Sequence, residues 1–296
     1  MASQKASAVE VAPRGTISDL WRRFRKNRLG LLGMGVVLAL AVVALLAPLI
    51  APYGPNGQNY GELLQPPGAG HWMGTDELGR DVLSRVLYGA RISLLAGAIS
   101  VAVALGFGLP IGLCSGYYRG FLDEVIVMRL TDAMQAFPFL ILALALAAAF
   151  GPGFINAMVA VGIGFTPGFI RVVRAQVLAQ REQDYVQAAR AMGATDLRIM
   201  FLHILPNSLA PILVQASLAM AAAVIFEAGL SYLGLGTQPP TPSWGSMLKI
   251  AQGYLVQASW MAVWPGVAIF IAVMGFNLLG DGIRDMMDPR SRGDGS

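Results

Sequence analysis

The sequence predicts an all-α integral membrane protein with six transmembrane helices. Charged residues make up only 13% of the 296 residues, whereas soluble domains carry about 25%, and the mean hydropathy is +0.60. Five long runs hold no charged residue at all, and each is long enough for a span of about 20 residues. These uncharged runs cover residues 29–50, 92–118, 133–170, 204–226 and 250–280.

The third run is long enough for two spans, and Gly151-Pro152-Gly153 near its middle predicts a tight turn between them. Five runs therefore give six spans. The expected segments are an N-terminal arm at 1–28, a first transmembrane helix at 29–50, an exterior loop at 51–91, a five-helix core at 92–283 and a tail at 284–296.

The basic residues predict which side of the membrane each loop faces. Of the 21, 17 fall in the arm, in the loops after the second and fourth spans, and in the tail. Such residues are enriched in cytoplasmic loops, so both termini and the loop at about 175–203 are expected in the cytoplasm. Leu20, Trp21 and Phe24 lie near one helical face of the arm, which indicates an interfacial helix. The alternative is a basic stretch that only fixes topology.

Several kinds of site are not expected. Cys114 is the single cysteine, which excludes an internal disulfide, and the two histidines are far apart in sequence, so no metal site is predicted. None of the three lysines follows a glycine, so the phosphate-binding pattern Gly-Lys-Ser/Thr is missing. The sequence predicts no cofactor, no nucleic acid partner and no ATP chemistry on this chain.

The loop at about 175–203 is far longer than a connection between two spans requires. Tyr185, Ala188, Ala189 and Met192 recur at helical spacing and form a narrow apolar stripe on a short predicted helix. Gly193 is expected to end that helix with a positive φ angle, and a second helix should start near Thr195 or Asp196. Such a helix suits docking into a groove of a partner. A plain connecting helix is the alternative.

The residues of this loop resemble a known signature. Gln187-Ala188-Ala189 is followed by Gly193 and then by His203-Ile204-Leu205-Pro206, which resembles the Glu-Ala-Ala, Gly and Ile-x-Leu-Pro pattern in permeases of bacterial ATP-binding-cassette importers. Gln187 replaces the Glu and His203 the Ile. The resemblance implies a cytoplasmic coupling helix that docks into an ATPase subunit. Its expected residues are Tyr185, Gln187, Ala188, Ala189, Met192, Gly193 and Ala194, and Leu205 and Pro206 end the signature.

Residues 71–94, 226–248 and 276–290 resemble the dipeptide, oligopeptide, nickel and glutathione importers, and within them the C-type permease. The resemblance implies a permease subunit of the bacterial inner membrane, not an enzyme, that forms half of a pore. The implied partners are a second related permease, two ATPase subunits and an extracytoplasmic binding protein. It leaves open which of these solutes is transported.

Glu227 is an acid within an apolar stretch. A charge in hydrocarbon is costly, so it is expected either to line the translocation path or to lie near the outer boundary, hydrogen-bonded to loop backbone. Gly108, Gly112 and Gly116 share one helical face and should allow close helix packing. The charged loop 51–91 either meets an exterior partner or forms a structural turn at the pore mouth.

Two other classes of function remain as alternatives. Gly229-Leu230-Ser231 is faintly similar to the nucleophile motif of an intramembrane serine protease, but no histidine lies within a span to act as base. A stand-alone secondary transporter or channel is the stronger rival. Such proteins usually show repeated halves or charge pairs within the membrane, and neither is evident here.

Overall fold

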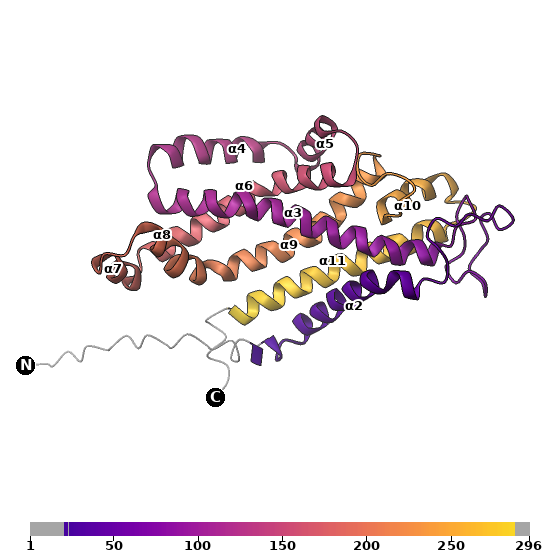
Figure 1. Ribbon diagram of the computed structural model, residues 1–296, viewed down its shortest axis with the longest axis horizontal. Helices are drawn as coiled ribbons and strands as arrows, with labels where there is room; N and C mark the ends of the chain where they lie inside the picture. Colours follow the sequence, from indigo (N-terminus) through magenta and orange to yellow (C-terminus); the bar gives the residue numbers. More distant parts are fainter. Residues whose placement is uncertain (1–20, 23, 288–296) are drawn as a thin grey trace, which may run out of the picture.

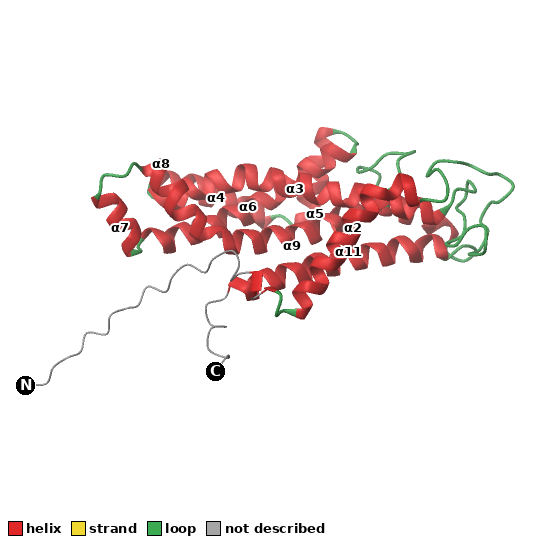
Figure 2. Ribbon diagram, turned by 60° about the horizontal axis from the view of Figure 1, so that its bottom comes forward, coloured by secondary structure: helices red, strands yellow, loops and turns green. Residues whose placement is uncertain are grey.

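The computed structural model describes residues 21–22 and 24–287 and is almost entirely helical over them. Five long helices form the body of the molecule (Figures 1 and 2). They are α2 (Arg28–Ile50), α3 (Val82–Tyr118), α6 (Phe154–Arg181), α9 (Leu205–Tyr232) and α11 (Trp260–Met287). The shorter elements are η1 (Leu122–Val127), α4 (Met128–Ala136), α5 (Phe139–Phe150), α7 (Asp184–Ala191), α8 (Asp196–Arg198), η2 (Ile199–Ile204), α10 (Trp244–Ala251) and η3 (Gln252–Tyr254).

Five helices are long and apolar enough to cross a membrane, and a bent pair of helices makes a sixth span if it is counted as one. The pair joins residues 122–136 to α5 with a bend of 98°. The sequence predicts a continuous third span at 133–150. That prediction is wrong, because the helix is broken at residues 137–138. Pro138 explains it, because proline disfavours helical backbone at the preceding residue, and Phe137 is extended with ψ 138°.

Other boundaries also differ from the sequence-based expectation. α3 starts at Val82 rather than near residue 92, because the Asp81 side chain accepts from the backbone N–H of Ser84 at 2.7 Å and caps the helix. The loop between α2 and α3 is therefore residues 51–81. The last span starts at Trp260 rather than 250, since α10 and η3 occupy the residues before it. The predicted interfacial helix lies largely outside the described residues.

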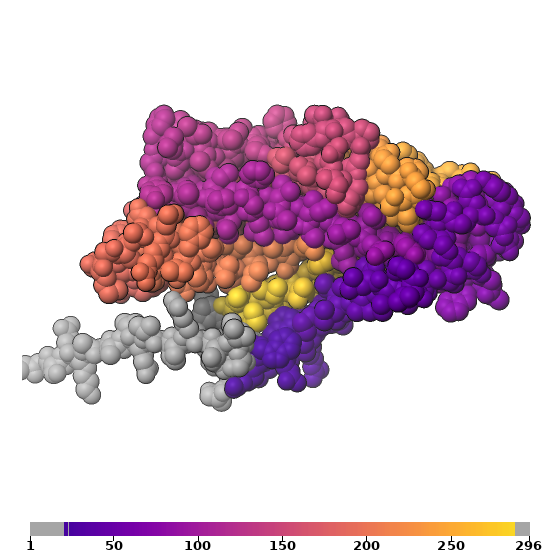
Figure 3. All heavy atoms as spheres, in the orientation of Figure 1, coloured from indigo at the N-terminus to yellow at the C-terminus, as the bar shows by residue number. Residues whose placement is uncertain are grey.

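The elongated bundle has two distinct ends (Figures 1 and 3). α7 and α8 project at one, called the α7 end. The loop 51–81 and α10 lie at the other, called the loop end. α3, α6, α9 and α11 run between them, and α2 packs along α11.

Glycines set the distance between α3 and α6. A Cβ atom at Gly108, Gly112 or Gly116 would come within 2.6–2.7 Å of the Cβ atoms of Phe169, Val173 and Val177, respectively. The packing is reciprocal, because a Cβ at Gly162 of α6 would lie 2.6 Å from Val103 Cβ. The expected close approach along this face of α3 is confirmed. Small residues allow such contact where lipid provides no hydrophobic drive for helix association.

We expect Gly112→Val to destabilise the protein by about 1–3 kcal/mol, as overpacking does elsewhere. The new side chain would meet Val173 Cβ at 2.7 Å and the Ile170 carbonyl oxygen at 2.9 Å, so α3 and α6 must separate. Thermal unfolding of the purified protein in detergent measures the change. Gly106→Val is the matched control, because a Cβ at Gly106 of the same helix meets nothing within 4 Å. Equal loss for both variants would mean that valine in the helix, not the contact, is responsible.

Candidate functional site

The first part of the candidate site is the α7–α8 segment, residues 182–204, which projects from the ends of α6 and α9 (Figure 2). α7 ends in a Schellman motif: Ala194 N–H donates to the Ala189 carbonyl at 3.1 Å, and Gly193 N–H donates to Arg190 at 3.0 Å. Gly193 has φ +79°, so the predicted positive φ is confirmed. Thr195 precedes α8 but makes no side-chain capping bond. The segment is the helix, glycine turn and helix that the sequence predicts.

The α7 helix turns a different face outward from the one that the apolar stripe suggests. Ala189 is 2% exposed and packs within the chain beside Val186, which is fully buried. Gln187 and Ala188 are exposed, and Met192 is 81% exposed. Ala189 therefore belongs to the inner face, and the outward face is formed by residues at the spacing 184, 187, 188 and 191. The stripe Tyr185, Ala188, Ala189 and Met192 is divided between the two.

Tyr185 also points inward and connects three helices. Its hydroxyl donates to Gln180 Oε1 of α6 at 2.7 Å and accepts from Asn207 Nδ2 of α9 at 3.1 Å. Asn207 follows Leu205 and Pro206, which are the first two residues of α9. Since Pro206 has no N–H, the regular bonding of the preceding turn is interrupted, and that turn, η2, is a π-helix. The signature end therefore marks the junction of the segment with α9.

Tyr117, near the end of α3, contacts residues on both sides of the Gly193 turn and so holds the α7–α8 segment in place. Its hydroxyl donates to Asp196 Oδ1 at 2.7 Å and accepts from Arg190 Nη2 at 3.4 Å, and the Arg190 guanidinium lies 5.8 Å from the ring centroid. Arg181 Nη1 donates to the Tyr117 carbonyl at 2.7 Å. Sequence reasoning missed this residue. The signal in the sequence that could have indicated it is its position as an aromatic residue with a polar hydroxyl at the end of the uncharged run 92–118.

An ion pair with a buried carboxylate lies beside Tyr117. Arg174 of α6 donates to Asp123 through Nε at 2.8 Å and Nη2 at 2.6 Å, and Ser115 of α3 also donates to the Asp123 carboxylate. Asp123 is 3% exposed. Removing one partner of such a pair leaves an uncompensated buried charge, so the pair fixes η1 against α3 and α6. The sequence analysis did not identify it.

Glu227 is fully buried within the chain near the loop end of α9. Its Oε1 accepts from Ser231 Oγ at 2.6 Å and from Thr237 Oγ1 at 3.1 Å. Thr237 lies in the loop after α9, and its backbone N–H donates to Ser231 Oγ at 2.8 Å. The acid thus ties this loop to α9, through side-chain hydroxyls rather than the loop backbone that the sequence suggests. Ser231, the serine of the protease-like motif, helps to hold the loop against α9 through these two hydrogen bonds.

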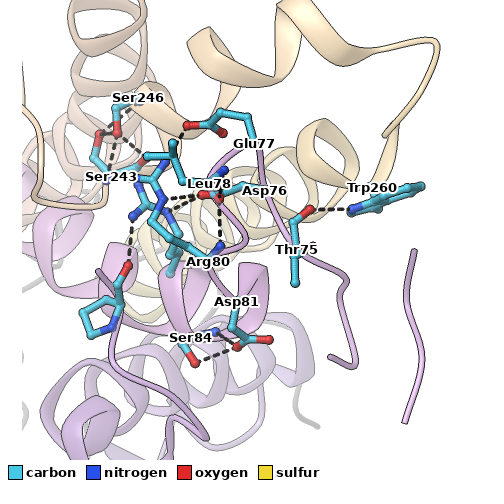
Figure 4. Close-up of polar contacts among 12 residues, drawn as sticks. Thr75, Asp76, Glu77, Leu78, Arg80, Asp81, Ser84, Ser243, Ser246 and Trp260 are labelled. Carbon is cyan, nitrogen blue, oxygen red and sulfur yellow. Dashed lines mark hydrogen bonds and ion pairs between the residues drawn. The ribbon is translucent and has the colours of Figure 1, made fainter. Parts of the chain in front are cut away.

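The charges of the loop 51–81 form a buried network at the start of α3 (Figure 4). Arg80 Nε lies 2.6 Å from Asp76 Oδ2 and its Nη2 2.7 Å from Glu77 Oε1. Arg85 Nη1 donates to the Pro55 carbonyl at 2.9 Å. Burial, with the nearby Asp76 carboxylate, raises the pKa of Glu77. These charges are paired inside the chain, which favours the structural alternative for this loop.

His71 links the loop to the α3 cap. Its Nδ1 lies 2.9 Å from Asp81 Oδ1 and its Nε2 3.2 Å from Glu62 Oε2. Burial lowers the pKa of His71, but the hydrogen bonds to Asp81 and Glu62 outweigh this effect and leave the pKa above its ordinary value. Within residues 24–287 no group of three His, Cys, Asp or Glu side chains is placed to hold a metal ion.

Tyr117→Phe should loosen the α7–α8 segment while the ring keeps its packing. The variant loses both hydroxyl contacts, to Asp196 and to Arg190, and each neutral or charged hydrogen bond contributes about 1–3 kcal/mol. Faster amide hydrogen exchange over residues 184–198 is the expected result. Tyr60→Phe is the control, since its hydroxyl bonds only to Gln58 within the loop 51–81. Unchanged exchange in Tyr117→Phe would show that the hydroxyl does not hold the segment.

The loop end should lose stability as the pH rises above about 6.5, the ordinary histidine pKa. Because the folded-state pKa of His71 is raised, protonation stabilises the folded form, and this contribution is complete below the unfolded pKa and lost as pH rises through the folded pKa. Limited proteolysis within residues 51–81 between pH 6 and 9 measures the effect. His71→Gln should remove the pH dependence in this range. A loop that resists proteolysis better at pH 9 contradicts the prediction.

Comparison with known proteins agrees with this architecture. Residues 108–293 match the family described as binding-protein-dependent transport system inner membrane component, and residues 16–67 match the N-terminal transmembrane domain of oligopeptide transport permease C. A chain of the MetNI methionine ABC transporter, in an inward-facing conformation, superposes with a TM-score of 0.58 at 21% identity. The match covers 70% of this chain and 98% of that one, and shows a shared fold.

Relatives in several bacteria are similar over nearly the whole chain. A dipeptide transport system permease of Alkalihalophilus pseudofirmus is 42% identical over 93% of this chain and 90% of its own length. A di/tripeptide permease of Pseudomonas aeruginosa is 44% identical over 93% and 92%. A glutathione transport system permease of Pectobacterium atrosepticum is 44% identical over 92% and 90%. The chain therefore belongs to the binding-protein-dependent transport system inner membrane component family, the multi-pass permeases of ATP-binding-cassette importers.

Proposed function

We propose that the chain is the transmembrane subunit of an ATP-driven importer for peptides or similar small solutes, and that it forms half of the pore. The solute class rests on the relatives, whose names are those of dipeptide, di/tripeptide and glutathione permeases. The single observation that carries the mechanism is the projecting α7 helix, because it presents small and polar residues outward, with the exposed Met192 and Leu197 just beyond its end, at an end of the molecule that lies beyond the long helices. A stand-alone transporter or channel has no use for such a surface.

The outward face of α7 docks into a groove of the ATPase subunit. It offers the small Ala188 at its centre, with Gln187 beside it and the exposed Met192 at the helix end. Leu197 of α8 is 63% exposed and lies just beyond the Gly193 turn. The small residues allow the helix to enter a groove of the partner, and the large apolar side chains beyond its end can pack against the groove wall. Ala189 and Tyr185 position this face from inside and do not touch the ATPase.

The complete importer contains a second related permease, two ATPase subunits and an extracytoplasmic binding protein in a bacterial inner membrane. Both chain termini and the α7 end face the cytoplasm, as the distribution of basic residues indicates. ATP is hydrolysed on the separate subunits, and this chain binds neither a cofactor nor nucleic acid. Glu227 lies toward the opposite, outer end, where it holds the loop after α9 beside the pore.

Ala188→Trp and Gly193→Val should both abolish copurification of the ATPase and ATP-driven uptake. Ala188→Trp places bulk on the docking face without disturbing the chain, because residue 188 is exposed. Gly193→Val has space for its side chain but cannot readily adopt φ +79°, so the turn must change. Membrane abundance should remain near normal for both. Gln187→Ala should be milder, since no charge is lost there.

Two controls separate docking from folding. Gly193→Asn should retain most ATPase copurification, because asparagine tolerates a positive φ. Ala189→Trp should instead lower the thermal stability of the chain itself, because the side chain it replaces is buried against the chain's own core. Normal copurification and uptake in Ala188→Trp and Gly193→Val would mean that the segment is only a connector. A chain that transports with no ATPase present would establish the rival function.

A further inference from the structure

An open groove of about 470 Å³ lies between α6, α9 and α11, toward the α7 end. Most of its lining is apolar, but three long polar side chains contribute to it, one from each helix: Gln176, Gln215 and Arg284. Gln176 lies five residues before the end of α6 and Arg284 three before the end of α11. Gln215 lies ten residues into α9, roughly 15 Å along the helix axis. The polar groups therefore extend from the α7 end into the depth of the bundle.

These three side chains are unpaired, unlike the charges of the ion pairs described above. None of them forms a hydrogen bond or ion pair with another described residue, and Gln215 and Gln176 are only half-buried. Gln215 also lies in the middle of a 23-residue run without charge, residues 204–226. An amide at this depth that faced lipid would lose its hydrogen bonds to water without replacement, so the groove must provide water or a polar ligand. The opposite side of α9 shows the contrast, since Leu213, about 200° around the helix from Gln215, is exposed there and suits lipid.

The groove also carries a positive charge in its lining. Arg284 is its one charged lining residue within the described structure. The neighbouring Asp285 accepts from Asn27 Nδ2 at 2.8 Å, on the side of α2, and Asp281 does not line the groove. A guanidinium with amides nearby is suited to a carboxylate, which accepts hydrogen bonds from both kinds of donor.

We propose that this groove is a water-filled part of the translocation path at its α7 end, and that Arg284, Gln215 and Gln176 receive the carboxylate of the passing solute. The inference rests on the proposed function, which supplies the solute, and adds where on this chain an anionic group is met. Half-exposed, unpaired side chains bind weakly, as release of the solute from the path requires.

The test measures water and charge in the groove directly in the assembled, ATPase-containing complex. In a Cys114→Ala background, Gln215→Cys is treated with anionic 2-sulfonatoethyl methanethiosulfonate. Leu213→Cys, two residues away on the other side of α9, is the matched control. Modification of Gln215→Cys at least roughly tenfold faster than Leu213→Cys is expected, since thiolates form readily only in water. Equal rates, or no reaction at either position, would show that lipid or the second permease covers the groove and would overturn the proposal.

The charge is tested by comparing that reagent with its cationic trimethylammonioethyl counterpart, after correction for their rates with a free thiol. The anionic reagent should be favoured at Gln215→Cys by roughly fivefold, the effect of one nearby charge in water. Arg284→Gln should remove this preference and Arg284→Lys should keep it. A preference that Arg284→Gln leaves unchanged would remove Arg284 from the site.

The two proposals fail separately. Absence of a copurifying ATPase from the unmodified chain would reject the proposed function. Slow, charge-independent modification in a complex that retains its ATPase and its uptake would reject only the groove.

Discussion

Close contact between α3 and α6 is the constraint on which the remaining arrangement depends. Helices in a bilayer gain little from apolar burial against one another, because lipid tails are as apolar as their side chains, so shape must hold them together. The glycine face of α3 receives Phe169, Val173 and Val177 of α6 along more than two helical turns. A similar contact joins α2 to α11, where the Cβ of an added side chain at Gly33 would overlap the backbone of Leu279. Two rigid helix pairs result, with α9 packed against both.

Rigidity matters because α3 connects the two ends of the molecule. Its first turn is fixed by the Asp81 cap and by Trp244, whose Nε1 donates to the Val86 carbonyl at 3.0 Å. Its last turn carries Tyr117, which holds Arg190 and Asp196 of the α7–α8 segment. A force on α7 is therefore passed to α3 through polar contacts and to α6 and α9 through covalent continuity and Tyr185. The same helix reaches the loop end without a break, which gives the docking segment a direct mechanical link to the opposite side of the bundle.

Much of this could be predicted from the sequence, and the remainder has physical reasons. Long uncharged runs predict spans reliably, because hydrocarbon excludes charge regardless of tertiary context, and Gly193 predicts a positive φ because few other residues adopt it. The outward face of α7 was not predictable, since alanines occupy both faces and only the buried Val186 indicates which is inner. The 98° bend at Pro138 was missed because proline within a span often causes a milder kink. The early start of α3 depends on Asp81, whose capping role was hidden among several loop acids.

Polar groups that are paired within the chain hold the helix bundle together, whereas the unpaired polar groups line the proposed translocation path. Asp123 is held by Arg174 of α6, Asp76 by Arg80, and Glu227 accepts through Oε1 from Ser231 and from Thr237 of the following loop, so each of these buried acids has a partner within the chain. In a low-dielectric interior such groups must be satisfied by fixed partners, so they cannot also exchange ligands rapidly. Gln176, Gln215 and Arg284 lack fixed partners among the described residues and keep their hydrogen-bonding capacity for mobile ones. A permease needs both kinds of group. The glycine-packed helices keep them apart, with the matched charges at the two ends and between α3 and α6, and the unmatched donors on the faces of α6, α9 and α11 that surround the groove.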